Sequence, residues 1–115
     1  MDRLLRRRDF LAAAKAPSCS TPSFVMRAKD RKDGKAPRVG FTCTKKIGNA
    51  VTRNRIRRRL KEAVRLSMAE HAAQSHDYVL IGRPAALTRD FEAIRKDIIS
   101  ALHKLHGTPN RTEQT

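Results

Sequence analysis

Side chains with phosphate-binding chemistry gather in residues 45–65 of this sequence, which read KKIGNAVTRNRIRRRLKEAVR. The segment carries nine Lys or Arg residues and a single acid, Glu62. Guanidinium and ammonium groups neutralise phosphates, and the planar guanidinium can also donate to two oxygens at once. A merely solvated helix face would mix charges through acid–base pairs, and one acid cannot pair with nine cations. The segment therefore predicts a polyanionic partner, either RNA or DNA.

A turn inside this segment adds a second phosphate-binding feature. Gly48 and Asn49 interrupt the preceding pattern just before a predicted helix, whose N-terminal amides carry partial positive charge. Two lysines, residues 45 and 46, come immediately before the turn and raise the positive potential. The Arg-Asn-Arg run at 53–55 then places an amide between two guanidinium groups, so phosphate oxygens and base or sugar edges can be contacted together.

We expect no catalytic chemistry from the chain itself. The acids are scattered, and Asp90 and Glu92 point to different sides of a predicted helix, so no carboxylate cluster suits a two-metal nuclease site. His103 and His106 are three residues apart on a helix but have no third ligand nearby, so no metal site is predicted. A self-contained nuclease is therefore a weak alternative.

The composition fits one small domain that binds a polyanion. The chain has 115 residues, of which 39% are hydrophobic and 4% aromatic, so we expect one domain with an aliphatic core over residues 1–107 and a disordered polar tail at 108–115. The net charge of +15 would destabilise the fold by self-repulsion unless a polyanion neutralised it. The alternative is a basic soluble domain with no polyanionic partner. Cys19 and Cys43 lack metal or redox spacing, and no apolar run approaches the roughly 20 residues of a membrane span. A reducing, cytoplasmic location is expected.

The hydrophobic pattern predicts the elements that position the cations. Residues 3–15 form a first helix, followed by Ser/Thr/Pro-rich turns and two strands over 24–29 and 38–44. A long helix capped by Thr52 or Asn54 then runs to near His76. Residues 77–83 are a continuous apolar strand suited to the middle of a sheet. A last helix begins at Thr88 as N-cap and ends with Gly107 at its C′ position.

A helical wheel separates the two sides of the long central helix. An apolar stripe within about 100° is predicted to pack inward; it consists of Ile56, Leu60, Ala63, Val64 and Ser67. The opposite side carries Asn54, Arg58, Lys61 and Arg65, and Arg55, Arg57 and Arg59 flank the stripe. Arg53 falls on the apolar side, so its long stem must reach past the sheet edge to solvent at the helix entrance.

The string Lys45-Lys46-Ile47-Gly48-Asn49-Ala50-Val51, followed by Arg53-Asn54-Arg55-Ile56 and Arg58, resembles the signature of the protein component of bacterial ribonuclease P. Few other families share this string. Shorter matches extend the likeness over about residues 3–105, in the right order; they are Arg3-Leu4, Asp9-Phe10, Phe24, Arg38-Val39-Gly40, Asp77-Tyr78 and Arg83-Pro84.

The resemblance implies a fold that the residue pattern alone does not give. It implies an α+β protein, a two-layer α/β sandwich in which a central mixed sheet carries two helices on one face and the N-terminal helix on the other. It also implies a left-handed βαβ crossover into and out of the signature helix, against the general right-handed rule.

The resemblance also implies the function and the site residues. The chain would be the protein subunit of ribonuclease P, an endoribonuclease that removes the 5′ leader of precursor tRNA. Chemistry would belong to Mg²⁺ ions held mainly by the catalytic RNA subunit, with no cofactor bound tightly by the protein, no membrane and no obligate protein partner. Positions matching the RNA-subunit contacts are Lys45, Lys46, Asn49, Arg53, Asn54, Arg55, Arg58 and Lys61. Positions matching the leader contacts are Phe10, Lys15 and Arg83.

The first helix departs from the family pattern. A second aromatic often follows Phe10 by one turn, and Ala14 stands there in this sequence. Pro17 also stands where the family often has Gly. Because stacking on aromatic rings helps hold single-stranded RNA, one stacking surface is missing from the expected leader cleft. The alternatives from other classes are a ribosomal or RNA-chaperone protein, which the composition allows but the signature disfavours, and a DNA-binding helix-turn-helix protein.

Overall fold

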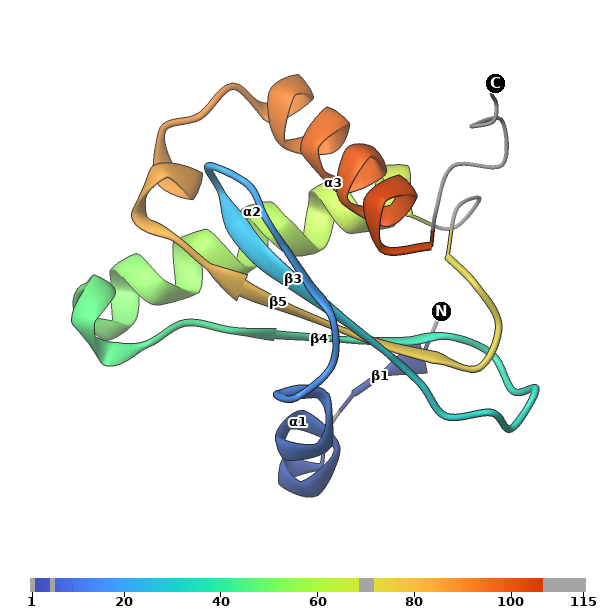
Figure 1. Cartoon of the computed structure of the whole chain (residues 1–115). Helices are drawn as coiled ribbons and strands as arrows, with labels where there is room; N and C mark the ends of the chain where they lie inside the picture. The colour runs from blue at the N-terminus through green and yellow to red at the C-terminus, as the bar shows by residue number, and fades with distance from the viewer. Residues whose placement is uncertain (1, 5, 69–71, 107–115) are drawn as a thin grey trace.

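Among residues 2–4, 6–68 and 72–106, which the computed structural model describes, five strands form one mixed sheet in the order β1-β4-β5-β3-β2 (Figure 1). The strands are β1 (Asp2–Arg3), β2 (Ser18–Ser20), β3 (Phe24–Asp30), β4 (Arg38–Thr42) and β5 (His76–Gly82). The helices are α1 (Arg7–Ala13), α2 (Ala50–Ser67) and α3 (Phe91–His106), with short 3-10 helices η1 (Lys45–Ile47) and η2 (Pro84–Leu87).

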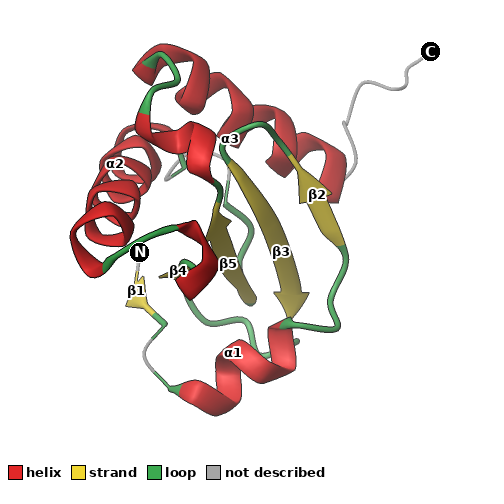
Figure 2. Cartoon of the chain, turned by 90° about the vertical axis from the view of Figure 1, so that its left-hand side faces the viewer, coloured by secondary structure: helices red, strands yellow, loops and turns green. Residues whose placement is uncertain are grey.

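The sheet topology confirms the expected fold class. β4 and β5 are parallel neighbours joined through α2, whereas β3 runs antiparallel to β5 and β2 antiparallel to β3. Followed along the chain in Figures 1 and 2, the β4-α2-β5 connection turns in the left-handed sense. The general preference is for right-handed connections, so this handedness agrees with the family resemblance rather than with the general rule.

The two faces of the sheet carry different layers. α2 and α3 cover one face, and α1 lies alone against the other (Figure 2). Alternation along β3 sends Phe24, Met26 and Ala28 into the main core on the side of α2 and α3. A smaller cluster under α1 contains Leu4, Ala13 and Val79, with Phe10 and Ile81 packed against it. β5 is the central strand and is buried from both sides, as its apolar run predicts.

Gly82 sets how closely α2 approaches the sheet. A Cβ atom at this position would lie 2.5 Å from Cγ2 of Ile56 and 2.7 Å from Sγ of Cys43. Because real Cβ atoms do not approach other atoms this closely, a larger residue would push α2 outward. The glycine therefore brings the apolar stripe of α2, centred on Ile56 and Leu60, into the core.

Two predicted helix boundaries are wrong. The first helix begins at Arg7 rather than residue 3, because Asp2–Arg3 pairs with β4 and the extended chain buries Leu4, whose amide donates to the carbonyl of Val39 at 2.9 Å. The central helix ends at Ser67 rather than near His76, which instead begins β5.

Smaller differences concern caps and strand ends. Asn49, not Thr52 or Asn54, caps α2, and the Asp90 carboxylate, not Thr88, accepts from the Ala93 amide at the start of α3. Residues 18–20, predicted as turn, form β2 because β3 has an open edge to pair with. β3 runs one residue longer than predicted and β4 ends at Thr42 rather than residue 44. Gly107 and the tail at 108–115 lie outside the described residues.

Candidate nucleic-acid interface

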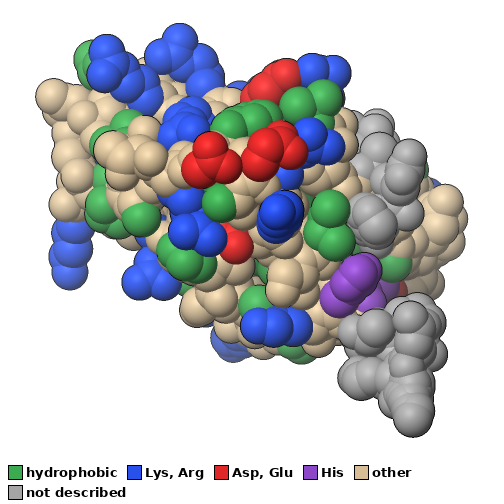
Figure 3. All heavy atoms as spheres, turned by 90° about the horizontal axis from the view of Figure 1, so that it is seen from above, with side chains coloured by type: hydrophobic (Ala, Val, Ile, Leu, Met, Phe, Trp, Pro, Cys, Tyr) green, Lys and Arg blue, Asp and Glu red, His purple; other side chains and the backbone are tan. Residues whose placement is uncertain are grey.

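α2 presents the predicted cationic face to solvent. The five predicted stripe residues are the buried residues of the helix, so the predicted inward side is confirmed. Asn54, Arg58, Lys61 and Arg65 of the predicted outward side are exposed, and so is Arg55, which flanks the stripe. Lys and Arg side chains are spread over the helix-covered surface of the molecule, interrupted by a smaller group of acids (Figure 3).

Acids do not neutralise most of this face. Glu62 pairs with Arg65, with Nε and Oε1 3.0 Å apart. Within the described part of the chain, Arg55, Arg58 and Lys61 take part in no ion pair. Their positive potential is therefore directed to solvent, where a polyanion can reach it.

Two arginines of α2 have roles that the sequence did not distinguish. Arg59 donates to the carbonyls of Ala86, Leu87 and Arg89 at 2.8–2.9 Å, so it ties α2 to the segment containing η2. Arg53 is half-buried, and its Nε is buried without a hydrogen-bond partner among the described residues. A buried donor left unpaired costs about 1–3 kcal/mol, so this position of Arg53 is unfavourable for the fold.

The turn before α2 places two more cations beside the helix N-terminus. Lys45 and Lys46 lie in η1 and are exposed. Asn49 is also exposed, and its Oδ1 accepts from the Thr52 amide at 2.9 Å. The side-chain oxygen of Asn49 therefore caps the helix. The two N–H groups of the same side-chain amide take no part in that bond.

A cleft lies on the other face of the sheet, between α1 and the strands. It has a volume of about 440 Å³, an apolar floor that includes Val79 and Ile81, and a rim that includes Arg7 and Arg27. Phe10, one of the three positions expected to contact the leader, lines this cleft. Lys15 and Arg83 are exposed but do not line it, and Arg83 donates through Nη1 to the carbonyl of Thr21 at 3.0 Å.

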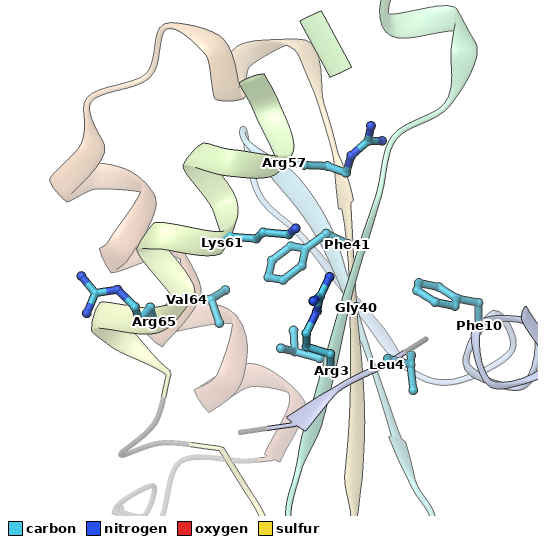
Figure 4. Close-up of a pocket in the computed structure, with 10 residues that line it drawn as sticks. Arg3, Leu4, Phe10, Gly40, Phe41, Arg57, Lys61, Val64 and Arg65 are labelled. Carbon is cyan, nitrogen blue, oxygen red and sulfur yellow. The ribbon is translucent and has the colours of Figure 1, made fainter. Parts of the chain in front are cut away.

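A second cavity, of about 790 Å³, leads from Phe10 around β4 to α2. In the close-up, Phe10 lies on the α1 side of β4, whereas Phe41 and Lys61 lie on the α2 side (Figure 4). Phe41 packs partly against the main core and also lines both this cavity and the cleft under α1. Phe10 and Phe41 line both cavities, so the two cavities meet at these residues.

An ion-pair network fixes α1 relative to the sheet. The buried carboxylate of Asp77 accepts from Nε and Nη2 of Arg38 at 2.8 and 2.7 Å and also accepts from Arg31. Arg38 then reaches Asp9 of α1, with Nη1 and Oδ2 3.6 Å apart. Burial opposes ionisation of Asp77, but the hydrogen bonds from Arg38 and Arg31 outweigh it, so the pKa of this carboxyl lies below its usual range.

Sequence reasoning missed several cations that line these cavities. Arg7 and Arg27 lie at the cleft under α1, and Arg3 and Arg57 line the cavity beside β4. Alternation gave a usable signal for Arg27, because β3 sends Met26 and Ala28 to the main core and so turns Arg27 to the opposite face.

The described residues contain neither a membrane-spanning helix nor a metal-binding cluster. No helix among them is both long and apolar enough to cross a membrane. No group of three or more His, Cys, Asp or Glu side chains in the described ranges could hold a metal ion.

Comparisons with known proteins agree on one family. The ribonuclease P family model matches residues 1–106. The ribonuclease P protein component of Ruegeria pomeroyi is 48% identical over 107 residues, covering 90% of this chain and 86% of that protein. That of Caulobacter vibrioides is 49% identical over 111 residues, covering 96% of this chain and 74% of that protein.

Solved structures show the same fold. The ribonuclease P protein of Thermotoga maritima superposes with a TM-score of 0.77 at 26% identity. The match covers 93% of this chain and 100% of the Thermotoga chain. The Staphylococcus aureus protein gives a TM-score of 0.72 at 26% identity, with 90% and 94% coverage. With its left-handed crossover, its cationic α2 and a family match along nearly its whole length, this chain belongs to the ribonuclease P protein family, the protein subunits of a tRNA-processing endoribonuclease.

Proposed function

We propose that this protein binds the catalytic RNA subunit through α2 and the 5′ leader of precursor tRNA through the cleft under α1. Family membership already implies association with ribonuclease P RNA. The observation that carries the finer assignment is that the unneutralised cations of α2 and the cleft containing Phe10 lie on opposite faces of one sheet. Two RNA elements can therefore be held at once without competing for the same surface.

The α2 surface suits a folded RNA. Its exposed Arg55, Arg58 and Lys61 can neutralise backbone phosphates, and the half-buried Arg53 adds a further positive charge near the start of the helix. Lys45 and Lys46 extend this positive surface to the turn before the helix. The RNA-subunit site of the proposal consists of Lys45, Lys46, Asn49, Arg53, Asn54, Arg55, Arg58 and Lys61.

The cleft suits a single strand. An aromatic ring at Phe10 can stack on a base, the apolar floor excludes water from it, and the arginines at the rim can contact phosphates. Lys15 and Arg83, which lie outside the cleft lining, would contact only a strand that continues beyond it. Because mature tRNA lacks the leader, these contacts favour the precursor over the product.

Hydrolysis in this proposal is carried out by Mg²⁺ ions bound to the RNA subunit, and the protein contributes charge neutralisation and substrate positioning. The proposed activity places the protein in the bacterial cytoplasm, where tRNA precursors are processed. The test is cleavage of precursor tRNA at low Mg²⁺ by the RNA subunit alone, the protein alone and both together. We expect efficient cleavage only by the combination; cleavage by the protein alone, or no gain over the RNA alone, would contradict the proposal.

A further inference from the structure

The cleft under α1 has a gap beside Phe10. Ala14, one helical turn after Phe10, lines the cleft with a methyl group, which offers no surface on which a base could stack. Arg27 of β3 lines the same cleft, and its side chain extends toward the chain that follows α1. The small side chain of Ala14 and the long side chain of Arg27 therefore line the same cleft.

The backbone of Arg27 is held rigidly. It lies in the middle of β3, opposite Ser18 of β2 on one side and opposite Val79 of β5 on the other. A residue with a strand on each side has little freedom to move, so the direction in which its side chain leaves the sheet is fixed. The base of the Arg27 side chain is therefore preorganised.

The guanidinium of Arg27 is held as well. Its Nη1 donates to the carbonyl of Ala16 at 3.1 Å, just after the end of α1. Within the described ranges Arg27 makes no ion pair, so its charge is not neutralised by a carboxylate. One donor is used to anchor the group, and the remaining N–H groups stay available to a ligand.

A guanidinium held in this way combines two properties that RNA recognition uses. Its flat face stacks on nucleobases much as an aromatic ring does, and its edge donates to phosphate oxygens. A lysine at the same position would keep the charge but would lose the flat face and the fixed fork of donors. An Arg27→Lys substitution therefore tests whether the flat shape of the guanidinium matters in addition to its charge.

We propose that Arg27 is the second base platform of this cleft, so that an unpaired nucleotide stacks on the guanidinium plane where Ala14 leaves an aromatic surface missing. This inference rests on the proposed function of the cleft as the leader site. It predicts that base stacking beside α1 depends on the Phe10 ring and on the Arg27 guanidinium plane. Salt should weaken this recognition more than it would weaken stacking on two rings, because part of it is ionic.

The test uses holoenzyme reconstituted from the catalytic RNA and the full-length protein. The ratio of the Kd for mature tRNA to the Kd for leader-bearing precursor is measured for wild type, Arg27→Ala, Arg27→Lys and Arg27→Tyr. Lys29→Ala is the matched control, because Lys29 is two residues along β3 on the same face but does not line the cleft. Thermal unfolding of each free protein verifies folding.

Arg27→Ala and Arg27→Lys should both lower the ratio about tenfold, Arg27→Tyr should retain most of it with weaker salt dependence, and Lys29→Ala should leave it unchanged. A 2-aminopurine scanned along the leader should report one position whose stacking is lost in Arg27→Lys but not in Lys29→Ala. A wild-type ratio in Arg27→Lys would overturn the platform, because a point charge would then suffice, and so would a wild-type ratio in Arg27→Ala. Equal wild-type affinities for the two tRNA forms would instead overturn the leader site itself.

Discussion

The ring of Phe10 lies directly over Gly40, where a Cβ atom would be 2.5 Å from its Cζ. The contact lets α1 pack close to β4, and the Asp9–Arg38 pair lies beside it. These two adjacent contacts join α1 to the strand through one apolar and one ionic interaction. Because Phe10 also lines both cavities, the same contact sets the shape of the proposed leader site.

Replacing Gly40 with Ala should therefore disturb α1 specifically. We expect a loss of about 1–3 kcal/mol in the free energy of unfolding from overpacking, together with weaker binding of leader-bearing precursor and unchanged binding to the catalytic RNA. Urea unfolding and the two binding assays measure these effects. Adding Phe10→Leu should recover part of the lost stability because it removes the clashing ring atoms; strictly additive losses in the double variant would show that the two residues do not interact.

Leu60→Ala tests the buried side of α2. Leu60 is fully buried among the core residues beneath the helix, so truncation should leave a cavity and cost about 2–5 kcal/mol. Denaturant unfolding of the free protein measures this loss. An unfolding curve that matches wild type would mean that the inward and outward sides of α2 have been exchanged.

Neighbouring arginines on α2 should behave differently. Arg59→Ala removes the hydrogen bonds to three carbonyls and should cost about 1–3 kcal/mol of stability. Arg58→Ala should leave stability unchanged but reduce the slope of log Kd against log salt for the catalytic RNA by about 1. Measuring unfolding and salt dependence for both variants gives the contrast, and identical behaviour in the two assays would count against separate structural and RNA-binding roles.

Asp77 should make stability depend on pH in the acid range. Its pKa in the folded protein lies below the ordinary value of 3.8, so the ionised form stabilises the fold at pH values above that ordinary value. This stabilisation is lost as pH falls through the lowered pKa. Asp77→Asn leaves Arg31 and Arg38 without their shared carboxylate and should cost about 3–5 kcal/mol at pH 7.

The difference between wild type and Asp77→Asn should shrink as pH is lowered from about 5 to 3, because the unfolded wild type takes up a proton at Asp77 in this range and the folded form, whose pKa is lower, does so only at lower pH. Unfolding free energies of the free proteins at pH 7, 5, 4 and 3 measure it, and the other carboxyl groups cancel because both proteins carry them. A difference that stays constant to pH 3 would mean that Asp77 does not contribute to the acid transition.

Local patterns were sufficient for the core elements and for the cationic helix. The stripe of α2 was identified correctly because side chains three and four residues apart share a helix face wherever the helix is placed. The alternation of Val39 and Phe41 likewise identified a strand. The Arg-Asn-Arg string and its lead-in were specific enough to indicate the family, which the comparisons confirm.

Elements stabilised by distant partners were not identified. Asp2–Arg3 became a strand because β4 offered an edge, and Ser18–Ser20 did so because β3 offered another. Pairing energy of this kind comes from a neighbour in space and leaves no periodic signal in a segment of two or three residues. The early end of α2 has a related cause: the Tyr78 hydroxyl, from β5, accepts from the Ala73 amide in the loop where the helix was expected to continue.

The sequence by itself determined that this protein has a cationic helix with one buried side and that its partner is a polyanion, because charge and helical periodicity are properties of the chain. Only the tertiary structure decided which cations remain available to that partner. In the folded protein Arg59 donates hydrogen bonds to three carbonyls, Asn49 caps a helix, and Arg27 lines the cleft under α1. The reason is physical: a side chain's partners are set by the surfaces that packing brings within a few ångströms of it, and those surfaces come from segments far apart in the sequence.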